Sequence, residues 1–477
     1  MLIAEATIIN LPVFLHTDSW TGVKHEVSVK YSASYRTLKK DVIILGGGAS
    51  GTYAAVRLRE DYNKSIVVIE LGTVLGGNVN TYNDPVTGTA INYGVEAYID
   101  YGPAKDFFAR FDVPTQPVVQ FAANMTYADA ATGTLLSNIT VPPVADQLAA
   151  LQTYLTIVEQ YTPYLLPGYW DFPPGDAIPA DMLLPWVDFE AKYGVQDMYP
   201  IHDLIDGGSA PNATTLYVMM DFNQPVVAGY LDGTMFDPQP FNNSILYGRA
   251  QEFLGADVHF SSQVVNASRT DAGVSVLVRD DAGTTTLITA PRLLVSFQPT
   301  AANLAALAPD AAETAVFSTF ATAALFVGVV RTNFIPDNTS VSFVPGADAP
   351  PYAVVVDWSG TSGLSEIIFS SAAQPLFTEA QAKQAVVDAF TTLLTAGTFA
   401  PPAGEEASIE IVAFAEHAGM GFDQSVEMLE QGFIQQMYAL QGRRSTWWTG
   451  ALWCPGYSSN VWAFTDTVLP KLLEGLH

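Results

Sequence analysis

Two short apolar runs open the regular part of the chain. The first, Val42 to Leu45, ends in three glycines, and the second, Ile66 to Ile69, ends in Glu70. Small residues with helical character lie between the two runs, which predicts the order strand, tight turn, helix and strand. This order is typical of the nucleotide-binding βαβ unit of α/β proteins.

Strand and helix patterns return further along the chain. Helical spacing of apolar residues predicts helices over 144–160 and 378–394 and a last helix after Ser458 and Ser459, which we expect to cap it. The strands that we expect are 256–265, 274–278, 293–296, 323–330, 352–357, 366–370 and 409–414. Between about residues 104 and 240 prolines and aromatic residues are frequent, so this part is not another βαβ unit and suits the wall of an apolar pocket.

The glycines after the first strand follow the spacing G-x-G-x-x-G. Gly46 turns the strand end, Gly48 lets the backbone approach a pyrophosphate, and Gly51 lets the helix pack closely. Glu70 lies 24 residues after Gly46, where its carboxylate can accept the ribose hydroxyls and repel the 2′-phosphate of NADP. A chain with 36 glycines produces such spacings by accident, but the two flanking strands favour dinucleotide binding over an unrelated glycine-rich turn.

A second glycine pair, Gly76 and Gly77, follows the ribose-binding strand and precedes Asn78. Simple Rossmann enzymes that use NAD do not need this loop. Together with the late stretches 442–450 and 458–462, rich in tryptophan and serine, these motifs resemble the FAD-dependent amine-oxidase-like flavoprotein superfamily. Within it, the chain most resembles the fungal branch that includes β-cyclopiazonate dehydrogenase, from about residue 40 onward.

This resemblance implies an α/β fold, α+β overall, with a Rossmann-like FAD-binding domain and a discontinuous substrate domain built on a mixed sheet. The expected FAD-binding domain comprises 40–110, 240–310 and 430–477, the substrate domain 111–239 and 311–429, and residues 1–39 an N-terminal extension. The residues expected to contact FAD are Gly46, Gly48, Ala49, Ser50, Gly51, Glu70, Gly76, Gly77, Asn78, Val265, Gly450, Ser459, Asn460 and Val461.

The resemblance also bears on how FAD is attached. The family often has a histidine after the glycine pair, where it could bond covalently to the flavin, but this chain has Asn78. A carboxamide cannot make that bond, so we predict non-covalent FAD. Cys454 is the one cysteine, and a buried thiol is favoured over a flavin link.

Active-site candidates come from three stretches. In the resembling family the stretch around Tyr93 and Glu96 turns beneath the isoalloxazine ring, so these two residues and Trp448 are the candidates for catalysis. The alternative for this stretch, that its tyrosines are core aromatics and Glu96 is solvated, stays open. The expected substrate-binding residues are Tyr217, Met219, Phe222, Trp447 and Trp453. For Tyr217, Met219 and Phe222 a place in the core is the favoured alternative. His417 lies on a loop, where a surface histidine is favoured over a ligand contact.

The predicted function is that of an FAD-dependent oxidoreductase, an oxidase or dehydrogenase. It takes a hydride from a small, largely apolar or amine-bearing, secondary-metabolite-like substrate to flavin N5, with molecular oxygen as a candidate oxidant. Two alternatives stay open. One is a flavin-dependent double-bond isomerase or cyclase acting on a lipid or terpenoid with no net redox change, and the other is a non-catalytic protein that binds flavin or another ligand.

Charge narrows the choice of partners. With 48 acidic and 20 basic residues the net charge is −28, which argues strongly against nucleic acid or an anionic membrane surface as a partner. No apolar run is long enough to span a membrane, and the six histidines show no metal-ligand spacing, so we predict no metal.

The expected compartment is the secretory route. Seven of the seventeen asparagines stand in Asn-x-Ser/Thr sequons, where ordinary composition predicts about two or three. Against this, Glu5 interrupts the apolar run at the start, which makes a poor signal peptide.

Overall fold

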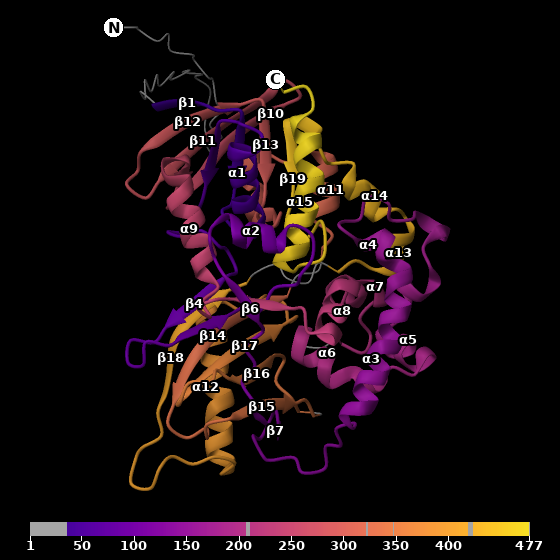
Figure 1. Cartoon of the computed structure of the whole chain (residues 1–477), viewed down its shortest axis with the longest axis vertical. Helices are drawn as coiled ribbons and strands as arrows, with labels where there is room; N and C mark the ends of the chain where they lie inside the picture. Colours follow the sequence, from indigo (N-terminus) through magenta and orange to yellow (C-terminus); the bar gives the residue numbers. More distant parts are fainter. Residues whose placement is uncertain (1–35, 207–209, 321–322, 347, 418–422, 477) are drawn as a thin grey trace, which may run out of the picture. The chain divides into compact units, whose positions relative to one another are not determined.

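The computed structural model describes residues 36–206, 210–320, 323–346, 348–417 and 423–476 (Figure 1). Within these ranges the strands form a five-stranded, a four-stranded and a six-stranded sheet and two two-stranded pairs. Helices pack on all three larger sheets, which gives the α/β architecture predicted from the sequence.

The five-stranded sheet is parallel throughout and contains both apolar runs of the predicted βαβ unit. Its order is β19 (Thr446–Trp448), β13 (Arg292–Val295), β2 (Val42–Leu45), β3 (Ile66–Ile69) and β9 (Val258–His259). Every residue of β2 and β3 is buried, as expected of parallel strands covered on both faces. Helices α1 (Ala49–Glu60) and α15 (Ser458–Leu473) lie side by side next to this sheet (Figure 1).

The four-stranded sheet adjoins the five-stranded parallel sheet, which we call the Rossmann sheet. Its order is β1 (Arg36–Lys39), β12 (Thr285–Ala290), β11 (Gly273–Asp280) and β10 (Ser262–Thr270). The hairpin between β11 and β12 turns at Gly283, which has a φ of +82°. The last four residues of the expected N-terminal extension are β1, which pairs in parallel with β12.

The six-stranded sheet is mixed, as predicted. Its order is β18 (Ile409–Glu416), β14 (Ala324–Thr332), β17 (Leu364–Ser371), β16 (Ala353–Trp358), β15 (Thr339–Val344) and β7 (Asn124–Asp129). Its neighbours are antiparallel except β15 and β7, which are parallel. The sequence pattern predicted β14, β16, β17 and β18 but neither β15 nor β7.

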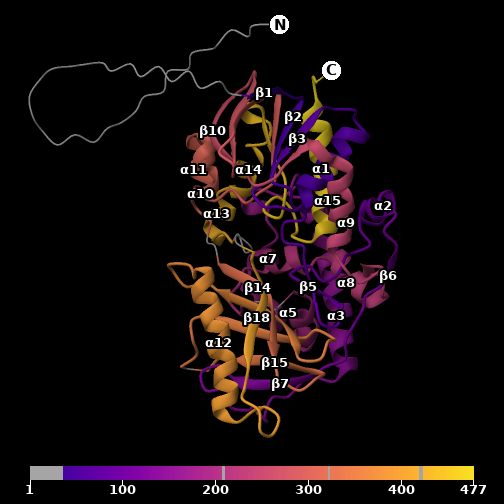
Figure 2. The same cartoon turned by 90° about the vertical axis from the view of Figure 1, so that its left-hand side faces the viewer.

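Helix α12 (Glu379–Ala396) covers one face of the six-stranded sheet (Figure 2). A capping box between Thr378 and Gln381 defines its start, and Gly397 ends it in a left-handed conformation. Because side chains alternate along a strand, Ile367 and Phe369 of β17 face α12 while Glu366 points to the opposite face. That opposite face packs against the hairpin of β4 (Asn80–Asn83) and β5 (Ala90–Tyr93).

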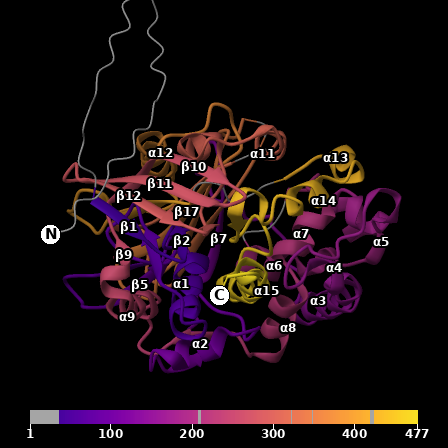
Figure 3. The same cartoon turned by 90° about the horizontal axis from the view of Figure 1, so that it is seen from above.

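The helices from α3 to α8 form one helical region beside the sheets and next to α15 (Figure 3). Its members are α3 (Val144–Val158), α4 (Thr162–Leu165), α5 (Trp186–Tyr193), α6 (Tyr199–Asp206), α7 (Thr215–Asp221) and α8 (Gln224–Asp232). The helix predicted over 144–160 is α3. The other named helices and strands are α2 (Ala104–Arg110), β6 (Thr115–Pro117), β8 (Phe236–Pro238), α9 (Ser244–Leu254), α10 (Ala301–Leu304), α11 (Ala311–Phe317), α13 (Val426–Glu430) and α14 (Phe433–Tyr438).

The helical region shares one continuous apolar core with the Rossmann sheet. Apolar residues from α3, α5 and α7 join the same buried cluster as β2, α1 and α15, whereas α12 and its sheet face form a second cluster. The proline-rich and aromatic stretch is therefore packed onto the nucleotide-binding sheet.

Candidate functional site

The turn after β2 can be built only with glycine at its key positions. Gly46 has a φ of +98°, and a Cβ on Gly51 would lie 2.0 Å from the carbonyl oxygen of Gly46. Gly48 stands at the N-cap of α1, where no side chain accepts a hydrogen bond from the first turn. The N–H groups of Ala49 and Ser50 therefore lie at a positive helix end that can bind a phosphate.

The second glycine pair lies directly against this turn. The N–H of Gly76 donates to the carbonyl of Gly47 at 2.9 Å, and a Cβ on Gly77 would lie 2.9 Å from the Cα of Gly48. Glu70 joins the two loops, because its carboxylate accepts hydrogen bonds from the N–H groups of Gly47 and Gly72, each at 2.6 Å. Each carboxylate oxygen keeps a lone pair for a ribose hydroxyl.

The first turn of α15 meets the first turn of α1. The indole N–H of Trp462 donates to the carbonyl of Ala49 at 3.1 Å, so the two helix N-termini are neighbours. We expected Ser458 and Ser459 to cap α15, but neither does so. The N-cap of the helix is Tyr457. Instead, the Ser459 hydroxyl donates to the carbonyl of Ile99 at 2.8 Å and accepts from its N–H at 3.2 Å.

Asn460, in the same turn, is completely buried, and neither its Oδ1 nor its Nδ2 has a hydrogen-bond partner within the described ranges. A buried amide without partners is costly, so a polar group of a ligand is expected there. Val461 follows it and is also buried. Gly450, with a φ of +113°, lies close to Ser50, since a Cβ on Gly450 would be 3.6 Å from the Ser50 hydroxyl.

Val265 stands at a bulge in β10. The pairing with β11 shifts between Val264 and Asn266, which leaves Val265 opposite no residue of the partner strand. A bulged residue has backbone groups outside the regular ladder, and these are available to a base such as adenine. The glycine loops, Glu70, the unsatisfied Asn460 and this bulge together fit FAD.

Tyr93 and Glu96 lie on the segment that leads from β5 to Ile99, between Asn78 and the start of α15. Gly94 fixes the position of this segment next to Asn78, because a Cβ on Gly94 would be 2.8 Å from the Asn78 carbonyl oxygen. The side chain of Glu96 is open to solvent, yet burial is the largest cause of the rise in its pKa to about 7, followed by repulsion from Asp357 and Asp237. The charged form of Glu96 is therefore disfavoured, although the residue is accessible.

His417 is buried, with 4% of its surface exposed, so the surface location favoured from the sequence is wrong. Its Nε2 lies 3.2 Å from the Nδ2 of Asn80, and its ring touches Gly94. Burial lowers the pKa of His417 to about 4, so the imidazole is neutral at physiological pH.

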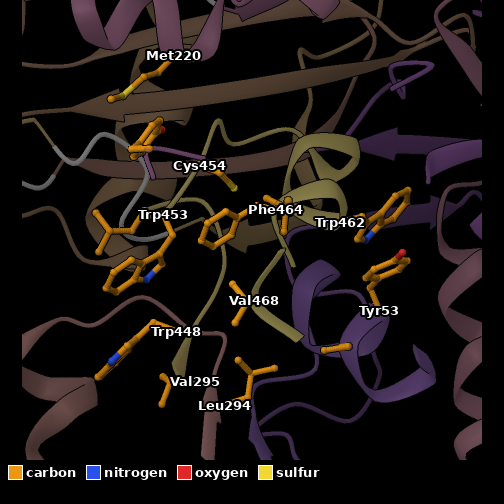
Figure 4. Close-up of a cluster of buried hydrophobic side chains, with 14 of the residues drawn as sticks. Tyr53, Met220, Leu294, Val295, Trp448, Trp453, Cys454, Trp462, Phe464 and Val468 are labelled. Carbon is orange, nitrogen blue, oxygen red and sulfur yellow. The ribbon is translucent and has the colours of Figure 1, made fainter. Parts of the chain in front are cut away.

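The tryptophans expected near the flavin belong mainly to the core. Trp448 and Trp453 are 0% and 1% exposed, and their rings stack at 6.0 Å (Figure 4). Trp447 points to the other face of β19, as alternation requires, and lies 5.2 Å from the Arg292 guanidinium. Trp448 and Trp453 therefore present no open surface to a substrate.

The expected pocket residues on and after α7 also differ in burial. Met219 and Phe222 are completely buried, and the Phe222 ring stacks on Tyr154 at 5.3 Å. The core interpretation therefore applies to both. Tyr217 is half-buried, and its hydroxyl accepts a hydrogen bond from the N–H of Gln424 at 2.7 Å.

Cys454 is completely buried, and its thiol donates to the carbonyl of Gly450 at 3.6 Å. Burial raises the pKa of the thiol well above its ordinary value, so it stays protonated and is a poor nucleophile. This environment agrees with the prediction of a structural thiol.

The sequence reasoning missed three acidic residues that face Glu96. Asp357 on β16 and Glu366 on β17 are direct cross-strand partners, and Asp237 lies on β8. We call these three residues and Glu96 the carboxyl cluster. The signal in the sequence was an acidic residue inside an apolar strand pattern, repeated on two neighbouring strands.

In the ranges that the structure describes, no three His, Cys, Asp or Glu side chains are placed to hold a metal ion. No helix of the described chain combines the length and apolar character that a membrane crossing requires.

The comparisons with known proteins agree with this geometry. A family model described as an NAD(P)-binding Rossmann-like domain matches residues 44–111. An FAD-dependent oxidoreductase of Monascus ruber is 32% identical, over 92% of this chain and 93% of the relative. The β-cyclopiazonate dehydrogenase of Aspergillus oryzae is 30% identical, over 91% and 93%.

Solved structures share the fold at lower identity. A fatty acid isomerase from P. acnes has a TM-score of 0.68 at 16% identity, covering 91% of this chain and 98% of that one. Cyclohexylamine oxidase from Brevibacterium oxydans has a TM-score of 0.59 at 17% identity, covering 92% and 99%. The chain thus shares its fold with these enzymes, and the curated relatives identify it as a flavoprotein that binds FAD. The chain belongs to the family of fungal FAD-dependent oxidoreductases that includes β-cyclopiazonate dehydrogenase.

Proposed function

We propose that this oxidoreductase takes a hydride from a small, largely apolar or amine-bearing, secondary-metabolite-like substrate, and that molecular oxygen can accept the electrons afterwards. The observation that carries this proposal is the position of Glu96, an accessible carboxylate on the segment between Asn78 and the start of α15. The half-buried Tyr93 and Tyr217 suit an apolar substrate body. The relative from Aspergillus oryzae is named β-cyclopiazonate dehydrogenase, and the structural neighbour from Brevibacterium oxydans is named cyclohexylamine oxidase.

The protein would supply binding, orientation and electrostatics around the cofactor. When bound, FAD supplies the hydride acceptor. The glycine loops and the N-terminus of α1 would hold the pyrophosphate, Glu70 the ribose, and the amide of Asn460 a polar edge of the flavin. The positive end of α15 would stabilise negative charge that develops at that edge.

The test is anaerobic mixing of the purified holoprotein with a panel of apolar secondary metabolites and apolar amines, followed by flavin absorbance. We expect at least one panel member to bleach the flavin, and air to restore its colour with release of hydrogen peroxide. Turnover without any bleached flavin would instead identify an isomerase or cyclase. Full flavin occupancy with neither bleaching nor turnover across the panel would favour a protein that only binds a ligand.

The attachment of FAD can be tested separately. Acid precipitation should leave the yellow colour in the supernatant, because Asn78 cannot bond to the flavin and the Cys454 thiol is neutral and buried. The variant Cys454→Ser should release FAD equally well. Colour retained in the wild-type pellet and lost from the Cys454→Ser pellet would show a thioether link.

A further inference from the structure

The carboxyl cluster brings together acidic side chains from three strands, β8, β16 and β17, and from the segment after β5 that carries Glu96. Period-two alternation points Asp357 and Glu366 away from α12, because their neighbours Val356 and Ile367 belong to the buried cluster under that helix. Asp357 and Glu366 are opposite each other in the β16–β17 register. Both therefore face the side of the sheet on which the β4–β5 hairpin and Glu96 lie.

The interactions within the cluster are repulsive. Burial is the largest cause of the raised pKa of Glu366, followed by the charges of Glu96 and Asp357. Burial also raises the pKa of Asp357, against the opposing effect of the Ser340 hydroxyl. Carboxyl groups this close cannot all ionise together, so the cluster holds a proton near neutral pH.

Buried polar atoms near Glu96 lack hydrogen-bond partners among the described residues, so a polar group of a ligand is expected there. Asp237 is completely buried, and its Oδ2 accepts from the N–H of Val119 at 2.7 Å, while its Oδ1 has no partner in the described ranges. Asn243 is also completely buried, and its amide donates to the carbonyls of Val95 and Glu96 at 2.6 and 3.3 Å. Its Oδ1 likewise lacks a partner among the described residues.

Glu96 is the member of the cluster that a substrate can reach. Its side chain is exposed, whereas Asp357 and Glu366 are half-buried and Asp237 is fully buried. The segment that carries Glu96 is fixed at one end by Gly94 against Asn78 and at the other by the two hydrogen bonds between Ile99 and Ser459. Both contacts belong to the predicted flavin site.

We propose that Glu96 accepts the proton that the substrate loses during oxidation, and that Glu366 and Asp357 set the protonation state in which it does so. This inference rests on the proposed function. Glu96 is the catalytic residue, because it would touch the substrate. Asp357 and Glu366 are positioning residues that act through it.

The proposed step balances as follows. The bond between the substrate carbon and hydrogen breaks, and its electron pair leaves with the hydrogen as a hydride to the flavin, the oxidant of this family. The neighbouring N–H, O–H or C–H bond also breaks, and its electron pair forms the new double bond to that carbon. The released proton bonds to a carboxylate oxygen of Glu96. The substrate therefore loses two electrons and two protons in total, counting the one within the hydride.

The electrostatics suit a base that works near neutral pH. A general base is most effective when its pKa lies close to the pH of the reaction. Burial and the charges of Asp357 and Asp237 raise the pKa of Glu96. Because Glu366 keeps its proton, Glu96 and Glu366 do not carry two negative charges at the same time. The charge of Asp357 raises the pKa of both Glu96 and Glu366, so removing this charge should lower both pKa values.

The first test needs no substrate. Infrared titration of the holoprotein between pH 5 and 9 follows the conversion of protonated carboxyl groups to carboxylates. Burial raises the pKa of Asp237 to about 6, so this group also titrates in the range. We therefore expect a wild-type transition whose amplitude falls by one carboxyl group in Glu96→Gln, and whose Glu96 component moves to lower pH in Asp357→Asn, because one repelling charge is gone. Glu410→Gln, on the exposed face of β18 in the same sheet, is the matched control and should titrate like the wild type. An unchanged transition in Glu96→Gln would overturn the proposal.

The second test uses a panel substrate that bleaches the flavin. The bleaching rate of the wild type should fall at acidic pH as Glu96 becomes protonated. Glu96→Gln should be slower by roughly 10²–10⁴-fold and lose this acidic limb, and Asp357→Asn should move the limb to lower pH. Glu96→Asp keeps a carboxyl group and should recover part of the rate, which separates loss of the base from loss of folding.

The outcomes distinguish this proposal from the proposed function. An acidic limb that stays in place in Asp357→Asn, or that persists in Glu96→Gln, overturns the role of the cluster while oxidation itself stands. If no panel substrate bleaches the flavin, the proposed function fails, and the infrared titration still decides whether Glu96 is the titrating group that Asp357 controls.

Discussion

At the scale of single residues, the cofactor turn depends on the lack of a side chain at Gly51. A Cβ there would lie 2.0 Å from the Gly46 carbonyl oxygen and 2.5 Å from the Ser296 hydroxyl, so α1 could not stay against the strand end. We expect Gly51→Ala to reduce FAD affinity roughly tenfold or more, the equivalent of about 1.4 kcal/mol. Flavin content after purification and titration of the apoprotein with FAD measure the effect.

Gly248→Ala is the matched control for this variant. Gly248 also lies in a helix, but a Cβ there would meet no atom within 4 Å. Alanine is favoured over glycine in a helix by about 1 kcal/mol, so this variant should keep its FAD and be slightly more stable. Equal flavin content in both variants would contradict the packing role of Gly51.

The buried imidazole of His417 makes stability depend on pH. Its pKa is lowered to about 4 in the folded protein from an ordinary value of 6.5, so the unfolded chain binds the proton more tightly between these values. The stabilisation is therefore complete above about pH 6.5 and is lost as the pH falls toward 4, by an order of 2–3 kcal/mol. Urea unfolding at pH 7 and pH 5 should show a smaller loss of the free energy of unfolding in His417→Gln than in the wild type.

At the scale of elements, a buried ion pair joins β10 to α11. Arg269 and Glu313 are 0% and 2% exposed at their side chains and share two hydrogen bonds of 2.7 Å. Glu313 also completes the capping box of α11 with Asp310. Glu313→Ala would leave the guanidinium buried and uncompensated, so we expect a loss of about 3–5 kcal/mol in the free energy of unfolding.

An exposed pair provides the contrast. Glu379 and Lys383 interact on the open side of α12, with side chains 58% and 41% exposed. Glu379→Ala should change the free energy of unfolding by at most about 0.5 kcal/mol, because water screens the pair. Chemical denaturation of both variants compares the two sites, and similar losses would show that burial of the Arg269 pair is unimportant.

Some parts of the site follow from a single stretch of sequence, and others depend on how separate strands pair. The turn at 46–51, Glu70 and the loop at 76–77 are linear motifs, whose roles follow from the local backbone and could be assigned in advance. The carboxyl cluster depends on a cross-strand register between Asp357 and Glu366 that no local pattern specifies. The aromatic character of the tryptophans suggested a binding surface. In the structure, however, Trp448 on β19 is completely buried.

At the scale of the whole molecule, the FAD site requires segments about 400 residues apart in sequence. Trp462 bonds to Ala49, and Asp466 on α15 accepts hydrogen bonds from Tyr53 at 2.9 Å and from Arg57 at 2.5 Å on α1. These hydrogen bonds join α1 and α15, the two helices whose N-termini are expected to contact FAD. The sequence motifs at both ends predicted the pairing, but the side chains that join the two helices were outside those motifs.

The sequons test the predicted compartment at the same scale. The exposed ones are Asn63, Asn124, Asn138, Asn212, Asn266 and Asn338, whereas Asn242 is half-buried. A sequon must be accessible to be modified, so we expect endoglycosidase to increase the electrophoretic mobility of the natural protein. Asn63→Gln should remove one glycan from that shift, and Asn242→Gln, the matched control, should leave it unchanged. Natural protein that migrates identically before and after the enzyme would show that the sequons are unused and would remove the argument for the secretory route.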